Sequence, residues 1–195
     1  AWNTTTPAAV GPGIYRLIVS QLNGCTCPDT DTAYAFVNAY TGFVAQVCTG
    51  SNTSFVSDAS GTTYQWQVNS GSGFVNLTAN TYYSGINTAQ LNLINIPSGF
   101  YGYQYRCLVN GATYSSTSSL EMVAYWSGAA NNDWENTGNW NCGAVPDKNT
   151  DVLINAGKPN YPEINCNRAV RSITADPATS LKVKANKILM ATGHN

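Results

Sequence analysis

The sequence predicts an all-β fold, and three observations lead to that prediction. Large apolar residues alternate with polar ones along short stretches such as "YQWQV" (64–68) and "YQYRCLV" (103–109). Charged residues make up only 10% of the 195 residues, too few for long helices held together by ion pairs. Turn-forming clusters such as "NSGSG" and "IPSGFYG" separate the alternating stretches. Short strands at regular spacing with turn signals between them are typical of a sandwich or a related β architecture.

The alternation predicts ten strands, seven before residue 125 and three after it. In chain order they cover residues 14–21, 33–39, 53–58, 63–69, 90–94, 102–110, 118–124, 151–155, 169–174 and 181–189. The basic residues are distributed unevenly, since seven of the nine Lys and Arg follow residue 125. This shift in composition predicts a module boundary near residue 125.

Trp66 and Cys107 stand on two central strands in a pattern typical of an immunoglobulin-like sandwich. In that fold a Trp on strand C packs against a Cys on strand F, and a Tyr two residues before the Cys forms the tyrosine corner. Tyr105 stands two residues before Cys107, and the alternation places both on an inward face. We therefore expect Trp66 and Tyr105 in the core. A sandwich of another type, in which Trp66 only fills core space, is the alternative.

The six cysteines favour disulfides over a metal site. Zinc requires clustered thiolates completed by further thiolates or histidines, whereas the single histidine here is His194. Disulfides indicate an oxidising compartment. Cys25 and Cys27 are too close for an easy mutual bridge and stay unassigned. We expect no metal and no cofactor.

Two bridges are expected among the remaining four cysteines. Phe55 occupies the place where strand B of an immunoglobulin domain usually carries the partner of the strand F Cys. Cys48 lies seven residues earlier, so a Cys48–Cys107 bridge is expected at the edge of the sandwich. Cys142 and Cys166 are expected to pair with each other across the segment that follows the tryptophans.

A family resemblance extends this interpretation. The run from "VCTGSNTSF" through "YQWQVNSGSGFVNL", "YYSGINTAQLNL" and "YGYQYRCLVNG" resembles the immunoglobulin-like repeats of large surface and secreted proteins in Bacteroidota. "GPGIYRLIVSQLNGC" is similar to the closing strands of such a repeat, and "YWSGAANNDWENTGNWNCGAVPD" to a Trp-rich opening followed by short repeated strands.

The resemblance implies immunoglobulin-like sandwich modules in tandem. Residues 1–42 would be the C-terminal strands of a preceding repeat, 43–124 a complete sandwich, and 125–195 the start of a further β-rich, Trp-rich module. Proteins of this kind are typically exported by the type IX secretion system, which implies an extracellular or outer cell-surface location. The chain would then be an excerpt from a longer array.

Catalysis is not expected from these residues. His194 is the only candidate histidine base, and Asp133 and Glu135, the candidate carboxylate pair, also fit a solvated loop. The clusters "PDTD" (28–31) and "NNDWEN" (131–136) offer oxygens of the kind that calcium prefers. Turn formation by the same Asp and Asn side chains is the alternative.

Two functions remain open. The first is a structural or adhesive module of a long surface or secreted protein, with neighbouring modules of the parent chain, secretion machinery, other surface proteins or glycans as partners. The second is a carbohydrate-binding accessory module, in which Trp126, Trp134 and Trp140 form a sugar-stacking platform rather than a small core. The net charge of −1 gives no reason to expect nucleic acid, and no apolar run is long enough to span a membrane.

Overall fold

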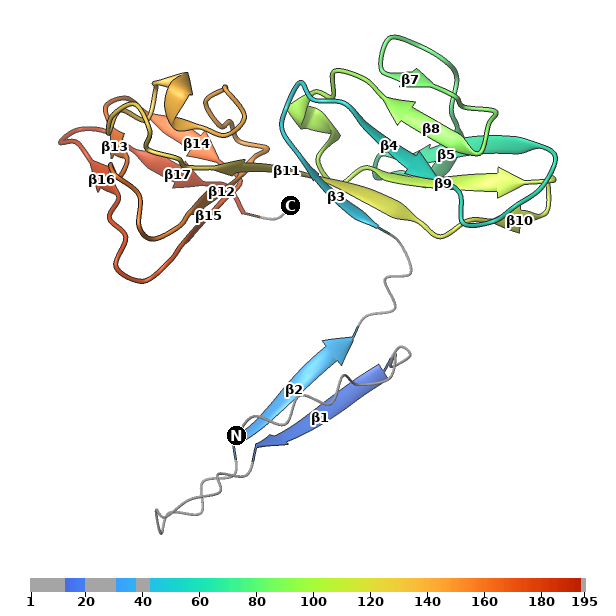
Figure 1. The fold of residues 1–195 in the computed structure, drawn as a ribbon, viewed down its shortest axis with the longest axis horizontal. Coiled ribbons are helices and arrows are strands. Elements are labelled where there is room, and N and C mark those ends of the chain that lie inside the picture. The colour runs from blue at the N-terminus through green and yellow to red at the C-terminus, as the bar shows by residue number, and fades with distance from the viewer. Residues whose placement is uncertain (1–12, 20–30, 38–42, 194–195) are drawn as a thin grey trace. The chain divides into compact units, whose positions relative to one another are not determined.

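The computed structural model describes residues 13–19, 31–37 and 43–193, and regular structure in this part of the chain is almost entirely β (Figure 1). Two single-turn 3-10 helices, Ser98–Phe100 and Thr137–Asn139, are the only helical elements described. Within these residues no helix has the length and apolar character needed to cross a membrane. The chain divides into two units, Ala1–Thr41 and Gly42–Asn195.

The first unit contributes one antiparallel pair of strands. β1 (Gly13–Val19) pairs with β2 (Asp31–Val37) along its full length, with Gly13 opposite Val37. The strands predicted here, 14–21 and 33–39, overlap the observed ones, and their last two residues, 20–21 and 38–39, lie outside the described residues. Cys25, Cys27 and His194 lie outside the described residues.

The first part of the second unit forms two sheets around a hydrophobic core. One sheet contains, in spatial order, β3 (Val44–Val47), β11 (Ser118–Tyr125), β9 (Gln104–Val109), β5 (Tyr64–Asn69) and β6 (Phe74–Asn76), with β10 (Thr113–Tyr114) also paired to β9. The other sheet contains β4 (Thr53–Val56), β8 (Gln90–Leu93) and β7 (Tyr83–Ser84). Every pair is antiparallel except β3 with β11, which run parallel.

The core between these sheets is rich in aromatic residues. Trp66 lies opposite Cys107 on neighbouring strands, and the two are 1% and 0% exposed. The Trp66 indole donates a 2.9 Å hydrogen bond to the carbonyl of Thr88. Tyr105 is also fully buried, but its hydroxyl lies 3.2 Å from the hydroxyl of Tyr83. The expected tyrosine corner, a bond from Tyr105 to upstream backbone, is therefore replaced by a contact between two side chains.

After β11 the chain winds into parallel coils. β12 (Asp151–Ile154), β13 (Glu163–Ile164) and β14 (Arg168–Val170) form a first coil, and β15 (Ser172–Ala175), β16 (Lys182–Val183) and β17 (Leu189–Ala191) form a second. Each strand of the second coil pairs in parallel with the corresponding strand of the first, and β12 also pairs in parallel with β11. The strand pairs β12–β15, β13–β16 and β14–β17 form three columns, in which paired residues are 21, 19 and 21 positions apart in the sequence.

Two strand predictions fail in these coils. The expected strand 169–174 is two strands, β14 and β15, separated by a corner at Arg171. The expected strand 181–189 is likewise split into β16 and β17, with a turn between Lys184 and Lys187. A coil places consecutive short strands in different columns, so a continuous apolar pattern does not mark a continuous strand.

Three tryptophans build a second core inside the coil module. Trp126, Trp134 and Trp140 are 0%, 0% and 4% exposed. Their ring centroids lie 4.7–6.3 Å apart, and two of the three ring pairs meet edge to face. The Trp140 indole donates a 2.9 Å bond to the carbonyl of Trp134. Of the two alternatives left open by the sequence, the structure has the core and not an exposed platform.

Candidate functional site: the junction of two modules

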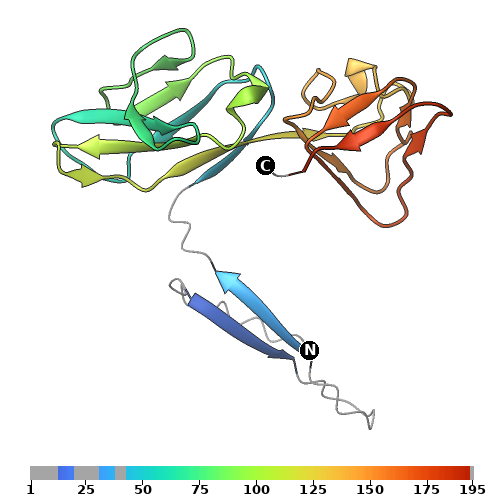
Figure 2. The ribbon, with the colours of Figure 1, turned by 180° about the vertical axis from the view of Figure 1, so that it is seen from behind.

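β11 belongs to both parts of the second unit. Its inward residues Leu120 and Met122 are fully buried in the first core, which we call the sandwich core. Two residues further on the same face, Ala124 and then Trp126 lie in the second core, which we call the coil core. Figure 2 shows the strand passing from the sandwich to the coils without interruption. The two cores are therefore joined by one strand and not by a linker.

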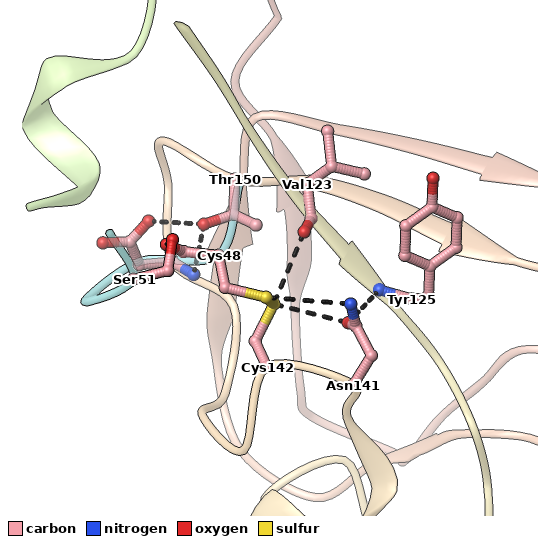
Figure 3. Close-up of a disulfide and its surroundings, with 8 residues drawn as sticks. Cys48, Ser51, Val123, Tyr125, Asn141, Cys142 and Thr150 are labelled. Carbon is pink, nitrogen blue, oxygen red and sulfur yellow. Dashed lines mark hydrogen bonds between the residues drawn. A yellow bond between two sulfur atoms is a disulfide. The ribbon is translucent and has the colours of Figure 1, made fainter. Parts of the chain in front are cut away.

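A disulfide closes the same junction. Cys48 follows β3 and is bonded to Cys142, 94 residues later in the sequence, with a Cα–Cα distance of 5.3 Å (Figure 3). In the chain-entropy model, closing a loop of that length stabilises the folded state by about 4.7 kcal/mol. The bridge connects the sandwich to the coil module.

Local hydrogen bonds hold both ends of the bridge in place. Ser51 donates to the Cys48 carbonyl through its hydroxyl, at 2.7 Å, and through its backbone N–H, at 3.1 Å. On the other side, Asn141 accepts a 2.6 Å bond from the Tyr125 N–H and donates its own N–H to the Tyr125 carbonyl. The Cys142 sulfur lies 3.4 Å from the Val123 carbonyl oxygen. The bridge therefore sits directly against β11.

The expected pairing of cysteines is wrong. β3 runs parallel to β11 and carries Cys48 to a point beside Val123, whereas Cys107 lies next to Ser115. Ser118 pairs with Tyr105, Val123 lies five residues further along β11, and Cys107 lies two residues away from Tyr105 in the opposite direction. About seven strand positions, or about 23 Å, therefore separate the two cysteines. Cys107 carries a free thiol in the sandwich core.

Cys166 is also a free thiol and does not pair with Cys142. Its sulfur lies 3.1 Å from a carboxylate oxygen of Glu135, in the hydrogen-bonding position of a thiol donor. The proximity of this carboxylate raises the pKa of the Cys166 thiol, chiefly through that hydrogen bond. The residue is held away from Cys142 by its place at the corner between β13 and β14.

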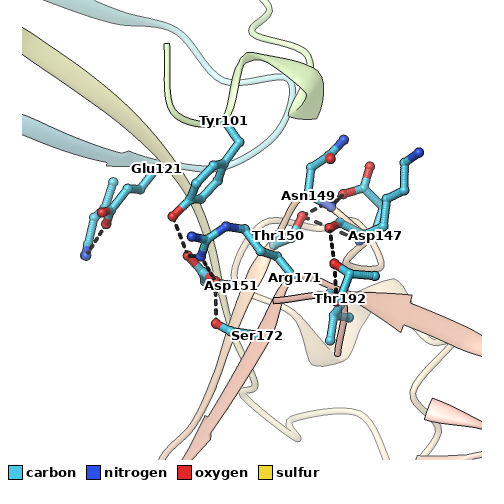
Figure 4. A network of polar contacts seen from close by, with 12 residues as sticks. Tyr101, Glu121, Asp147, Asn149, Thr150, Asp151, Arg171, Ser172 and Thr192 are labelled. Atoms are coloured by element: carbon cyan, nitrogen blue, oxygen red, sulfur yellow. Dashed lines mark hydrogen bonds and ion pairs between the residues drawn. The ribbon is translucent and has the colours of Figure 1, made fainter. Parts of the chain in front are cut away.

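A polar network forms the third connection (Figure 4). Asp151, at the start of β12, accepts two bonds from one guanidinium nitrogen of Arg171, at 2.6 and 2.8 Å, and one from the hydroxyl of Ser172. Tyr101 reaches it from the sandwich with a 3.0 Å hydroxyl bond. The Arg171 guanidinium also lies 3.9 Å over the Tyr101 ring. The Arg171 and Asp151 side chains are only 9% and 16% exposed.

The charge at Asp151 is stabilised by these partners. Burial opposes ionisation, but hydrogen bonds from Ser172, Arg171 and Tyr101 outweigh it and lower the pKa of Asp151. Burial and the bond to the carboxylate raise the pKa of Tyr101. Tyr101, Arg171 and Ser172 all donate to Asp151, so this carboxylate links the two sides of the junction. No motif in the sequence predicts that Tyr101, Asp151 and Arg171 meet, because each comes from a different segment of the chain.

A loop beside the network adds further contacts. Asp147 accepts a 2.5 Å bond from Ser98 of the sandwich, and Asn149 donates to the same hydroxyl at 3.3 Å. A polar cleft of about 640 Å³ lies here, between the 3-10 turn of the sandwich and the coils. Its lining includes Tyr101, Lys148, Asn149, Arg171 and Thr192.

Asp133 and Glu135 are each bound by neighbouring groups of the chain. Glu135 binds the Arg168 guanidinium through both carboxylate oxygens, and this contact lowers the pKa of Glu135. Asp133 caps a turn, accepting 3.1 Å bonds from the Glu135 N–H and from the side chain of Asn165. Both carboxylates are occupied by structural partners.

The structure gives no support to a calcium site in "NNDWEN". Within residues 43–193 and the two described strands of the first unit, no three His, Cys, Asp or Glu side chains come together as metal ligands. Asn131, Asp133 and Asn136 instead accept backbone N–H bonds two residues ahead, as turn-forming side chains do. Most of the other cluster, 28–31, lies outside the described residues.

Comparison with known proteins adds one finding. A family model described as a domain of unknown function (DUF8693) matches residues 125–194. The matched region contains the three tryptophans and both coils. None of the curated proteins matches the chain.

Proposed function

We propose that the chain is a non-catalytic structural segment of a long bacterial surface or secreted protein, in which a sandwich and a coil module form one stiff piece. The observation that carries the proposal is the triple junction: a shared strand, a disulfide and a buried polar network. A binding or catalytic device based on domain movement would need a flexible hinge at this position. A spacer that holds neighbouring modules apart needs a rigid connection at this position.

The strand order supports an immunoglobulin-like interpretation of the sandwich. In immunoglobulin domains, strands B, E and D form one sheet, and strands G, F and C form the other. Taking β4, β8 and β7 as B, E and D, and β11, β9 and β5 as G, F and C, reproduces both sheets. Phe55 stands on the B equivalent, with its ring centroid 5.4 Å from that of Tyr105. An aromatic core thus replaces the usual inter-sheet disulfide.

The carbohydrate-binding alternative loses its main support. A sugar ring stacks on an exposed indole face, whereas all three tryptophans of the expected platform are buried. Neighbouring modules of the parent chain, secretion machinery or other surface proteins remain the partners that we propose. The disulfide fits an extracellular or outer cell-surface location.

The mechanical part of the proposal is tested by pulling on the full chain from its two ends. The Cys48–Cys142 bridge encloses every sandwich strand except β3, so force passes along β3 and the bridge and not through the strands between residues 48 and 142. Reduction should release 94 further residues, or about 320 Å of extended chain. The double variant Cys48→Ser with Cys142→Ser should behave like the reduced chain. Equal extension with and without reductant would contradict the proposal.

The location is tested on the parent protein in its own cells. Protease added to intact cells should release peptides from residues 43–193, and a cytoplasmic marker protein should stay uncut. Release only after cell lysis would rule out an exposed position, whatever the result of the pulling experiment.

A further inference from the structure

The second coil repeats the apolar pattern of the first without its burial. In the first coil, four inward aliphatic residues are 0–1% exposed: Val152, Ile154, Ile164 and Val170. The register places an aliphatic residue of the second coil beside each of them: Ile173, Ala175, Val183 and Ala191. None of these four is buried, and Val183 is 44% exposed. The second coil therefore carries core residues that lack a cover.

The backbone shows the same asymmetry. β12 lies between β11 and β15, with a parallel partner on each side. Among the described residues, β15, β16 and β17 each pair on one side only. Three columns therefore end in an open row of N–H and C=O groups, each placed to accept one more parallel strand.

The second column, formed by β13 and β16, indicates a preference for a negatively charged residue in a strand that stacks on it. Glu163 of the first coil receives a 3.0 Å bond from Asn132 and forms a 3.2 Å ion pair with Lys184 of the second. The Lys184 side chain is still 54% exposed. A carboxylate one coil further along this column would meet the same ammonium group.

We propose that the edge formed by β15, β16 and β17 is a stacking surface for a further parallel β coil of 19–21 residues, with aliphatic inward positions. The occupant follows from continuity with the contact between the first and second coils, which already has this geometry. Terminal coils that face solvent normally carry polar residues at such positions, and Val183 does not meet that requirement. The inference depends on the coil geometry and not on the surface location proposed above.

The test supplies a further coil from the chain's own sequence. A second copy of residues 172–192, with the copied counterpart of Lys182 changed to Glu to face Lys184, is inserted directly after Thr192 in the full chain. In the matched control insert, the copied counterparts of Ile173, Val183 and Ala191 are changed to Asp. Amide hydrogen exchange is then followed in the original β15, β16 and β17, with β9 of the sandwich as an internal reference for folding.

The matched insert should slow exchange in the three edge strands by roughly tenfold or more, because their outward amides gain partners. The Asp control should leave exchange unchanged. Equal exchange in both extended chains, with β9 protected, would overturn the proposal. Slow exchange in the unextended chain that grows with protein concentration would also overturn it, since a second copy would then cover the edge.

A second pair of variants tests the proposal even if the insert folds poorly. Val183→Lys should change the melting temperature of the unextended chain only slightly, because the Val183 side chain is 44% exposed there and no strand covers it among the described residues. The same change in the extended chain should lower the melting temperature by several degrees. Equal effects in both chains would mean that no coil stacks on Val183.

Discussion

Asp151 is the residue on which both sides of the junction converge. Its carboxylate receives Tyr101 from the sandwich and Arg171 and Ser172 from the coils. The change Asp151→Asn removes the negative charge that faces the largely buried Arg171 guanidinium, so we expect a loss of about 3 kcal/mol in the free energy of unfolding. Urea denaturation at neutral pH measures the loss.

The pH dependence of stability provides an independent check on Asp151. Its pKa is lower in the folded chain than in the unfolded one, so its contribution is present above the unfolded value of about 3.9. The contribution is lost as the pH falls through the folded pKa. Asp151→Asn should therefore flatten the acid side of the stability profile. Glu121→Gln, which removes a carboxylate bonded at 3.3 Å to Gln46, is the matched control and should leave the profile steep.

Cys107 tests the pairing of cysteines at a single residue. Because its thiol is free and packs in the sandwich core, Cys107→Ala should cost only about 1 kcal/mol of stability and leave the bridge intact. Peptide mapping without reductant should link the peptides of Cys48 and Cys142 in both proteins. A linked peptide containing Cys107 would contradict this assignment.

At the scale of the elements, a close contact between Gly128 and Asn160 fixes the position of the tryptophan core. The Trp126 indole donates a 2.7 Å bond to the Asn160 carbonyl, and the Asn160 side chain donates a 2.8 Å bond to the Gly128 carbonyl. A Cβ at Gly128 would lie 2.1 Å from that same Asn160 oxygen, and the residue has φ +60°. Gly128→Ala should therefore destabilise the coil module by about 3 kcal/mol, from backbone strain plus the displaced contact.

Gly143 is a matched control for this prediction. Its φ is +62°, but a Cβ there would meet nothing within 4 Å. Gly143→Ala should lower the free energy of unfolding only by the cost of placing an alanine in the left-handed backbone region, about 1–2 kcal/mol. Thermal unfolding followed by tryptophan fluorescence compares the two variants. Equal losses would mean that the contact with Asn160 contributes nothing.

The elements differ in how much of them the sequence could predict. The three longest strands of the sandwich, β5, β9 and β11, are six to eight residues long and half buried, so alternation marks them closely. The coil strands are two to four residues long, and alternation over such lengths carries almost no information. Their signal is the 21-residue spacing of weakly similar aliphatic residues, which becomes clear only once the columns are known.

The junction could not be predicted for a different reason. Six cysteines allow fifteen complete pairings, and spacing along the chain does not choose among them. The choice of Cys142 for Cys48 depends on the parallel course of β3 beside β11, which is a property of the assembled sheet. The contact of Tyr101 with Asp151 likewise joins residues 50 positions apart.

At the scale of the whole second unit, two separate cores raise the question of whether they unfold together. The sandwich core and the coil core share no residue, so their cooperation rests on β11, the bridge and the polar network. While the Cys48–Cys142 bridge is closed, a core that unfolds becomes a disordered segment that stays covalently attached to the core that is still folded. We therefore expect residues 43–193 to unfold in one calorimetric transition under oxidising conditions.

Removing two of the three connections should separate the cores. The triple variant Cys48→Ser, Cys142→Ser and Asp151→Asn removes the bridge and the central carboxylate of the polar network, leaving β11 and the bond between Ser98 and Asp147, and we expect two transitions. Hydrogen exchange should then show β12 and β15 opening at a lower free energy than β5 and β9, because the coil core is smaller and its edge is open. Cys107→Ala in the same background is the control and should not change the number of transitions. One transition in the triple variant would mean that the shared strand and the remaining contacts couple the two cores without the bridge, and the bridge would then serve only to shorten the path of an applied force.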